Sequence, residues 1–101
     1  MKQHINTTDW YSIEYEKQIK LCDILKIDIN LTVMFQHQFL PKITIGKMIE
    51  ILEKETTSID INRSFTSEEI WTLIIGFGMG GVEFFEKELC DALWKAVKEV
   101  L

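Results

Sequence analysis

Apolar side chains recur at every third or fourth position over residues 82–101, which is the spacing of one face of an α-helix. The members of this stripe are Val82, Phe85, Leu89, Leu93, Ala96 and Val100. Glu83, Lys87 and Asp91 line another side of the segment with alternating charge, as on a solvent-exposed helix face. We therefore predict a helix over residues 82–101.

A second helix is predicted over residues 67–75 from its start signal. Thr66 and Glu69 have the spacing of a capping box, in which each side chain accepts a hydrogen bond from the other residue's backbone N–H. Apolar residues cover most of the following turns, so we expect a buried helix that packs against residues 82–101. The expected core of this helical hairpin consists of Ile70, Leu73, Ile74, Phe85, Leu89, Leu93 and Ala96.

Further helices are predicted over about 45–55, with Thr44 as the N-cap, and from Asp9 to about Lys26. Residues 27–35 alternate between apolar and polar, as in a half-buried strand, although helix is favoured for 31–39 because the flanking segments are helical. The predicted fold is therefore mainly α, a compact bundle of four to five helices forming a single helical domain over residues 1–101. The alternative is an α+β fold with a small two-stranded pair from 27–35 and 59–65.

The glycine-rich segment 76–81 fits the pattern G-x-G-x-x-G through Gly76, Gly78 and Gly81. This pattern binds a dinucleotide only when a strand precedes it, a helix follows it and a later strand brings an acid to the ribose. In this chain the segment before the glycines has the start signal of a helix. The sequence ends at Leu101, about where the return strand would begin. We interpret 76–81 as a helix–helix corner; a small enzyme or nucleotide-binding domain that uses this turn is the alternative.

Composition and charge exclude several classes of function. The chain has 101 residues, 47% of them hydrophobic, and a net charge of −5 with Arg63 as its single arginine. Such a chain lacks the basic surface of a nucleic-acid binder, so we expect no direct nucleic-acid binding. We find no signal peptide and no apolar run of ~20 residues, and Cys22 and Cys90 are isolated among apolar neighbours. We therefore expect a cytoplasmic protein without membrane contact.

Chemistry-bearing residues do not converge at recognised spacings. His4, His37 and the two cysteines form no metal-ligand pattern, and the acids at 68–69 and 83–86 look like a capping turn and a solvated face. We therefore expect no metal, no cofactor and no catalytic residue, and we predict that the protein is not an enzyme.

Surplus apolar side chains on the last predicted helix indicate a protein partner. Four of them fall outside its main stripe: Phe84, Trp94, Val97 and Leu101. A wide buried face would explain them, and a partner-facing surface is the alternative, for which a homodimer is the simplest form. Glu83, Glu86 and Asp91 are candidates for an acidic ridge beside this surface.

The chain as a whole resembles a population of small phage and prophage proteins. The resemblance rests on many lysines against one arginine, on abundant isoleucine, and on segments such as 43–52 and 88–94. In these features the chain is similar to small orphan proteins of phages and prophages from AT-rich bacteria, a population that includes anti-CRISPR proteins. The resemblance implies an inhibitor that binds a host nucleic-acid-handling protein and displaces nucleic acid with an acidic face. No functional residue follows from it.

Overall fold

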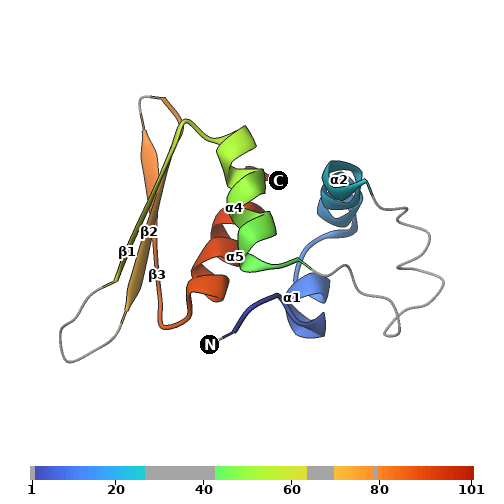
Figure 1. The fold of residues 1–101 in the computed structure, drawn as a ribbon. Coiled ribbons are helices and arrows are strands. Elements are labelled where there is room, and N and C mark those ends of the chain that lie inside the picture. Colours follow the sequence, from blue (N-terminus) through green and yellow to red (C-terminus); the bar gives the residue numbers. More distant parts are fainter. Residues whose placement is uncertain (1, 27–42, 64–69, 79) are drawn as a thin grey trace.

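The fold combines a three-stranded antiparallel sheet with helices on one of its faces (Figure 1). The computed structural model describes residues 2–26, 43–63, 70–78 and 80–101. Within these ranges the elements are α1 (Thr7–Tyr11), α2 (Tyr15–Leu25), α4 (Ile45–Glu55), β1 (Ser58–Arg63), β2 (Trp71–Gly76), β3 (Gly81–Glu86) and α5 (Leu89–Val100). The fold is α+β, so the prediction of a mainly α bundle is wrong.

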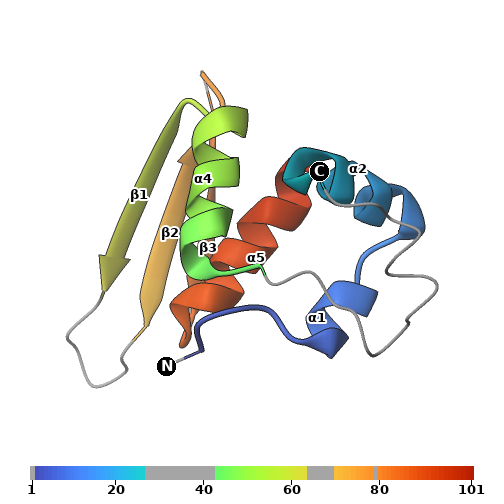
Figure 2. The ribbon, with the colours of Figure 1, turned by 45° about the vertical axis from the view of Figure 1, so that its right-hand side comes forward.

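The molecule is built in three layers. Helices α4 and α5 cover one face of the sheet, and α1 and α2 lie on the far side of these two helices (Figures 1 and 2). Helix α5 is therefore packed on both sides, and seven of its residues are buried. They are Leu89, Cys90, Ala92, Leu93, Trp94, Ala96 and Val97.

The predicted helix over 67–75 is the main error of the sequence analysis. Residues 71–76 form β2, the central strand, which pairs with β1 and with β3. Its Leu73 and Ile75 are fully buried against the helices. The run is rich in β-branched and aromatic residues, and a short continuous apolar run fits a buried strand as well as a buried helix. The capping box at Thr66 and Glu69 lies outside the described residues.

The predicted helix over 82–101 is divided into a strand and a helix. Residues 81–86 form β3, and α5 begins only at Leu89. Side chains alternate between faces along a strand, so Phe84 points to the helices while Phe85 points to the open face of the sheet. Phe85 is 57% exposed, and its predicted place in the core is wrong. Leu89, Leu93 and Ala96 are buried, as predicted.

The remaining predictions have mixed outcomes. Helix α4 has the predicted bounds, and the Thr44 side chain accepts a hydrogen bond from the Lys47 backbone at 3.2 Å. The predicted helix from Asp9 to Lys26 is two helices, separated at residues 12–14. In the alternative α+β prediction, residues 58–63 do form a strand, but it pairs with β2. The proposed pairing segment 27–35, like 31–39, lies outside the described residues.

The glycine segment 76–81 connects two antiparallel strands, so the predicted helix–helix corner is wrong. The backbone N–H of Phe77 donates to the Gly80 carbonyl at 2.8 Å, and Gly78 has φ of 74°, which a glycine adopts without a steric penalty. A strand follows the turn, whereas the dinucleotide-binding motif requires a helix whose N-terminus meets the pyrophosphate. The segment is therefore a hairpin turn.

Candidate interaction site

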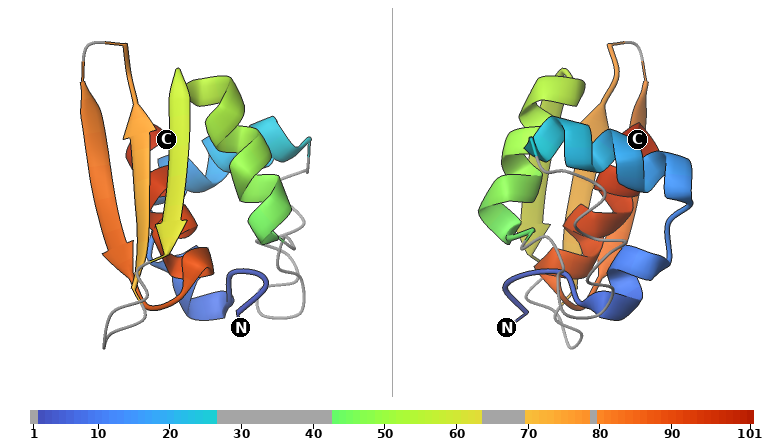
Figure 3. Two further views of the ribbon diagram at one scale, coloured as in Figure 1. Left: turned by 60° about the vertical axis from the view of Figure 1, so that its left-hand side comes forward. Right: turned by 90° about the vertical axis from the view of Figure 1, so that its right-hand side faces the viewer.

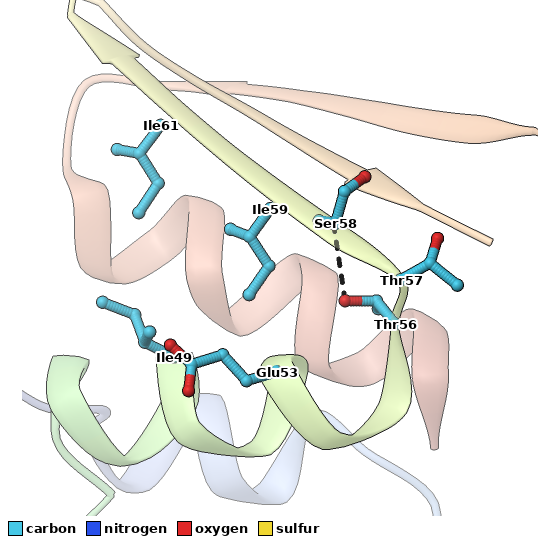
Figure 4. A pocket seen from close by; sticks show the side chains of 7 residues that line it. All are labelled: Ile49, Glu53, Thr56, Thr57, Ser58, Ile59 and Ile61. Carbon is cyan, nitrogen blue, oxygen red and sulfur yellow. Dashed lines mark hydrogen bonds between the residues drawn. The ribbon is translucent and has the colours of Figure 1, made fainter. Parts of the chain in front are cut away.

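A groove of about 430 Å³ lies between α4 and β1 (Figure 4). Two aliphatic side chains of β1, Ile59 and Ile61, point toward α4, where Ile49 faces them. Glu53 stands beside Ile49 on α4 and is exposed. Thr56, Thr57 and Ser58 close the end at which α4 turns into β1. The groove therefore has an aliphatic floor and a polar rim that includes one acid.

The short connection between α4 and β1 fixes this end of the groove. The Thr56 hydroxyl donates to the Leu52 carbonyl at 2.6 Å, which satisfies a carbonyl at the C-terminal end of α4. The Thr57 backbone N–H donates to the Gly76 carbonyl at 2.8 Å, and the Thr57 hydroxyl accepts from the Gly78 N–H at 3.0 Å. The end of α4, the start of β1 and the hairpin turn are thus held together, which anchors one wall of the groove.

The other wall of the groove is the edge of the sheet. In the described sheet the strand order is β1-β2-β3, so β1 has a neighbour on one side only (Figure 3). Alternate residues of an edge strand direct their N–H and C=O groups away from the neighbouring strand, where an added strand can pair with them. The groove therefore places aliphatic surface directly beside a strand edge to which no other described strand is paired.

The four apolar residues predicted as a partner surface are mostly packed inside the protein. Trp94 is 3% exposed and Val97 is fully buried, so both belong to the core. Phe84 lies on the face of β3 that α5 covers, and Leu101 is half-buried at the end of α5. These residues do not form a continuous exposed strip. The wide buried face is the better explanation for the surplus apolar residues of the last helix.

The three acids predicted as a ridge are separated. Glu83 is exposed on the open face of the sheet, whereas Glu86 points to the helix side and forms an ion pair with Lys95. Asp91, near the start of α5, accepts a hydrogen bond from the Lys2 ammonium at 2.6 Å. Two of the three carboxylates are thus compensated by lysines, and the acidic ridge is not assembled.

The Lys2 side chain ties the N-terminal segment to α5. Its ammonium donates to Asp9 at 2.7 Å as well as to Asp91, and its backbone N–H donates to Glu88 at 3.2 Å. Burial lowers the pKa of Lys2, but the hydrogen bonds to Asp9 and Asp91 outweigh it, so the pKa lies above its usual range. The cluster lines a polar pocket of about 280 Å³ with Trp94, Lys95 and Lys98. Because its ion pairs are formed within the chain, we assign it a structural role.

The described residues show little that supports nucleophilic or metal chemistry. Burial raises the pKa of the Cys90 thiol from 9.0 to about 11, so it is protonated at neutral pH. Within the described ranges, no group of three or more histidines, cysteines or carboxylates could hold a metal ion. No helix in the same ranges is long and apolar enough to cross a bilayer.

Other apolar side chains are exposed away from this groove. Tyr11, Tyr15 and Ile19 are each 42–54% exposed on α1 and α2, and Phe85 lies on the open face of the sheet. None of these positions lines the groove, because Tyr11, Tyr15 and Ile19 lie on helices and Phe85 of β3 points to the open face of the sheet, away from α4. The groove between α4 and β1 is therefore the strongest candidate for a binding site.

Sequence reasoning placed the candidate partner surface on the last helix, where the structure buries Trp94 and Val97. The alternation of Ile59 and Ile61 was visible, and it did indicate a strand. Nothing in the sequence showed that this strand lies at a sheet edge next to Ile49 and Glu53. Comparison of the chain with protein-family models, with curated proteins and with solved structures gives no match.

Proposed function

We propose that the protein is a non-enzymatic interaction module that binds an extended polypeptide segment along β1, over the groove between α4 and β1. The observation that carries this proposal is the aliphatic groove beside β1, an edge strand of the sheet that the described residues form. Strand addition is a common way to bind peptides, in which backbone hydrogen bonds give affinity and side-chain pockets give specificity.

The groove defines the chemistry of the partner segment. Every second side chain of an added strand faces the helix side, so two aliphatic residues spaced by two would lie on Ile59, Ile61 and Ile49. Among the described residues that line the groove, Glu53 is the charged one, so a lysine or arginine near these aliphatic residues would be favoured. The preferred partner is therefore an extended segment with alternating aliphatic side chains and one base.

The expected affinity is modest. Each backbone hydrogen bond contributes about 0.5–1.5 kcal/mol, and each buried aliphatic side chain about 1.5–3 kcal/mol. Association and the ordering of a flexible segment oppose these gains by several kcal/mol. Dissociation constants on the order of micromolar to millimolar follow, which is typical of a reversible contact made by a short segment.

A random dodecapeptide display library tests the proposal. We expect selection to enrich peptides with alternating aliphatic residues and a lysine or arginine. A selected peptide, labelled with a fluorophore, should then bind in an anisotropy titration. Glu53→Lys should weaken binding of the basic peptides about tenfold or more because it reverses the charge at the groove.

Glu50→Lys is the matched control. Glu50 is also an exposed acid of α4, but it pairs with Lys47 at 3.4 Å and does not line the groove. This variant should bind the same peptides with a change of less than about threefold. Failure to select any peptide, or an equal loss of binding in the two variants, would refute the proposal.

A further inference from the structure

We propose that the segment bound at β1 is β1 of a second copy of this chain, so that two sheets join edge to edge in a symmetric dimer. This inference rests on the proposed function, because it uses the same groove and the same strand edge. It adds the identity of the partner and the register of the pairing.

The sequence of β1 has the chemistry that its own groove requires. Ile59 and Ile61 alternate with polar residues, and Arg63 follows at the next position on the same face. By alternation, all three point to the side of the sheet where Glu53 stands. A second β1 therefore brings two aliphatic side chains and one base to the groove.

Charge favours the β1 edge over the other edge of the sheet. β1 contains one acid, Asp60, and one base, Arg63. β3 contains two acids, Glu83 and Glu86, and no base. Two β1 strands can thus approach as neutral segments, whereas two β3 strands would bring together two exposed Glu83 carboxylates, with Glu86 of each copy paired to Lys95.

The side chains also select one register. Two symmetric antiparallel registers pair most of β1: one centred on Asp60, which pairs residues 58–62, and one centred on Ile61, which pairs residues 59–63. Residues directly opposite each other share a face and lie close together. The register centred on Asp60 places two aspartates opposite each other, and this repulsion disfavours it.

The register centred on Ile61 gives complementary pairs. The two Ile61 side chains meet on the symmetry axis, over the joined grooves. Asp60 lies opposite Asn62 of the second copy, whose amide can donate to the carboxylate. Ile59 lies opposite Arg63 of the second copy, whose aliphatic stem can cover it. In its own chain the Arg63 guanidinium lies 5.4 Å from the centroid of the Trp71 ring, on the side of the sheet where Glu53 rims the groove.

Cysteine cross-linking tests both the dimer and its register. Ile61→Cys places two thiols directly opposite each other, at a Cα separation of about 4.5–5.5 Å, which a disulfide can span. Asp60→Cys is the matched control on the same strand, because diagonal partners are about 7–8 Å apart. After mild oxidation, a non-reducing gel should show a dimer for Ile61→Cys and mainly monomer for Asp60→Cys. Cys22 and Cys90 are buried in the protein, so neither should compete with the introduced thiol.

Charge changes at Asn62 provide a second measurement in which no side chain is removed from the core. Asn62 is exposed. In the register centred on Ile61, Asn62→Lys places a positive charge opposite Asp60 of the second copy. Asn62→Asp places a second negative charge opposite the same aspartate. Sedimentation equilibrium should show a tighter dimer for the first and a weaker dimer for the second, each by roughly 2- to 30-fold relative to wild type.

Each outcome decides the inference. A wild-type chain that stays monomeric at several hundred micromolar, or faster cross-linking of Asp60→Cys than of Ile61→Cys, would overturn it. Equal effects of the two Asn62 variants would also overturn it. If the monomeric chain still binds library peptides with the expected dependence on Glu53, the proposed function stands and only the identity of the partner is wrong.

Discussion

Truncation of two adjacent phenylalanines gives the clearest test of the sheet. Phe84 and Phe85 are neighbours in β3, but alternation places them on opposite faces. Phe84 packs against the core beneath α5, whereas Phe85 is 57% exposed on the open face of the sheet. A helix over 82–101 would instead put Phe85 in the main apolar stripe and Phe84 outside it, so the two folds predict opposite rankings.

The expected magnitudes follow from burial. Truncation of a core phenylalanine to alanine costs about 3–5 kcal/mol. Phe84 is half-buried, so we expect Phe84→Ala to lower the free energy of unfolding by about 2–3 kcal/mol. More than half of the Phe85 side chain is already in contact with solvent, so Phe85→Ala should cost less than about 1 kcal/mol. Leu93→Ala, at a fully buried position of α5, is the positive control at about 2–5 kcal/mol.

Urea unfolding followed by far-ultraviolet circular dichroism and tryptophan fluorescence measures these changes. Coincident transitions from the two probes would justify a two-state free energy for each variant. We expect the free energies of unfolding of Leu93→Ala and Phe84→Ala to lie well below that of the wild type. The free energy of unfolding of Phe85→Ala should lie close to the wild-type value. A larger loss for Phe85→Ala than for Phe84→Ala would refute the assignment of 81–86 to a strand with this register.

Three further predictions concern the N-terminal tie, a buried thiol and the hairpin. Lys2→Met should lower the free energy of unfolding by about 1 kcal/mol at low salt, because Asp9 and Asp91 lose their shared cation. This loss, measured by urea titration, should shrink in 1 M NaCl. A loss that does not depend on salt would contradict the ion-pair explanation. Stability should fall as the pH rises from 9 toward 11, because the Cys90 thiol ionises in the unfolded chain before it does so at its folded pKa of about 11. Cys90→Ala should flatten this alkaline decline in thermal melts, although Lys2, whose raised pKa acts in the same direction, will still contribute at higher pH. Gly78→Ala should lower the free energy of unfolding by about 1 kcal/mol, because φ is 74° at this position. Gly80→Ala should leave the melting temperature nearly unchanged, because an added Cβ there meets open space. Equal effects of the two variants on the melting temperature would contradict the turn geometry.

The sequence predicted those elements whose signals are local. Helix α4 has the Thr44 cap and a stripe through Met48 and Leu52, all within one segment. The C-terminal part of the last helix was also correct, because residues 89–100 have a broad apolar face that fits only a helix. For both helices, the residues that indicate the helix lie within the helix itself or directly before it.

The sheet and the candidate site depend on contacts between distant segments. The run Trp71–Ile75 has Trp71, Leu73 and Ile75 on the helix side but also the apolar Ile74 on the open face, so its period of two is not clear from the sequence. Whether β1 is an edge strand depends on which strands pair beside it. The groove arises only when that edge lies next to Ile49 and Glu53 of α4. The sequence therefore could indicate the aliphatic alternation of 59 and 61 but could not place it at a binding surface.

Mapping of a bound peptide by nuclear magnetic resonance tests the central claim most directly. A library-selected peptide is titrated into the ¹⁵N-labelled protein, and changes in amide chemical shift and hydrogen exchange are recorded for each residue. The account predicts that the largest shifts and new protection of alternate amides fall in 58–63, with further shifts at Ile49 and Glu53. Shifts concentrated at Ile74, Glu83 and Phe85 on the open sheet face, or along α1 and α2, with β1 unchanged, would contradict it.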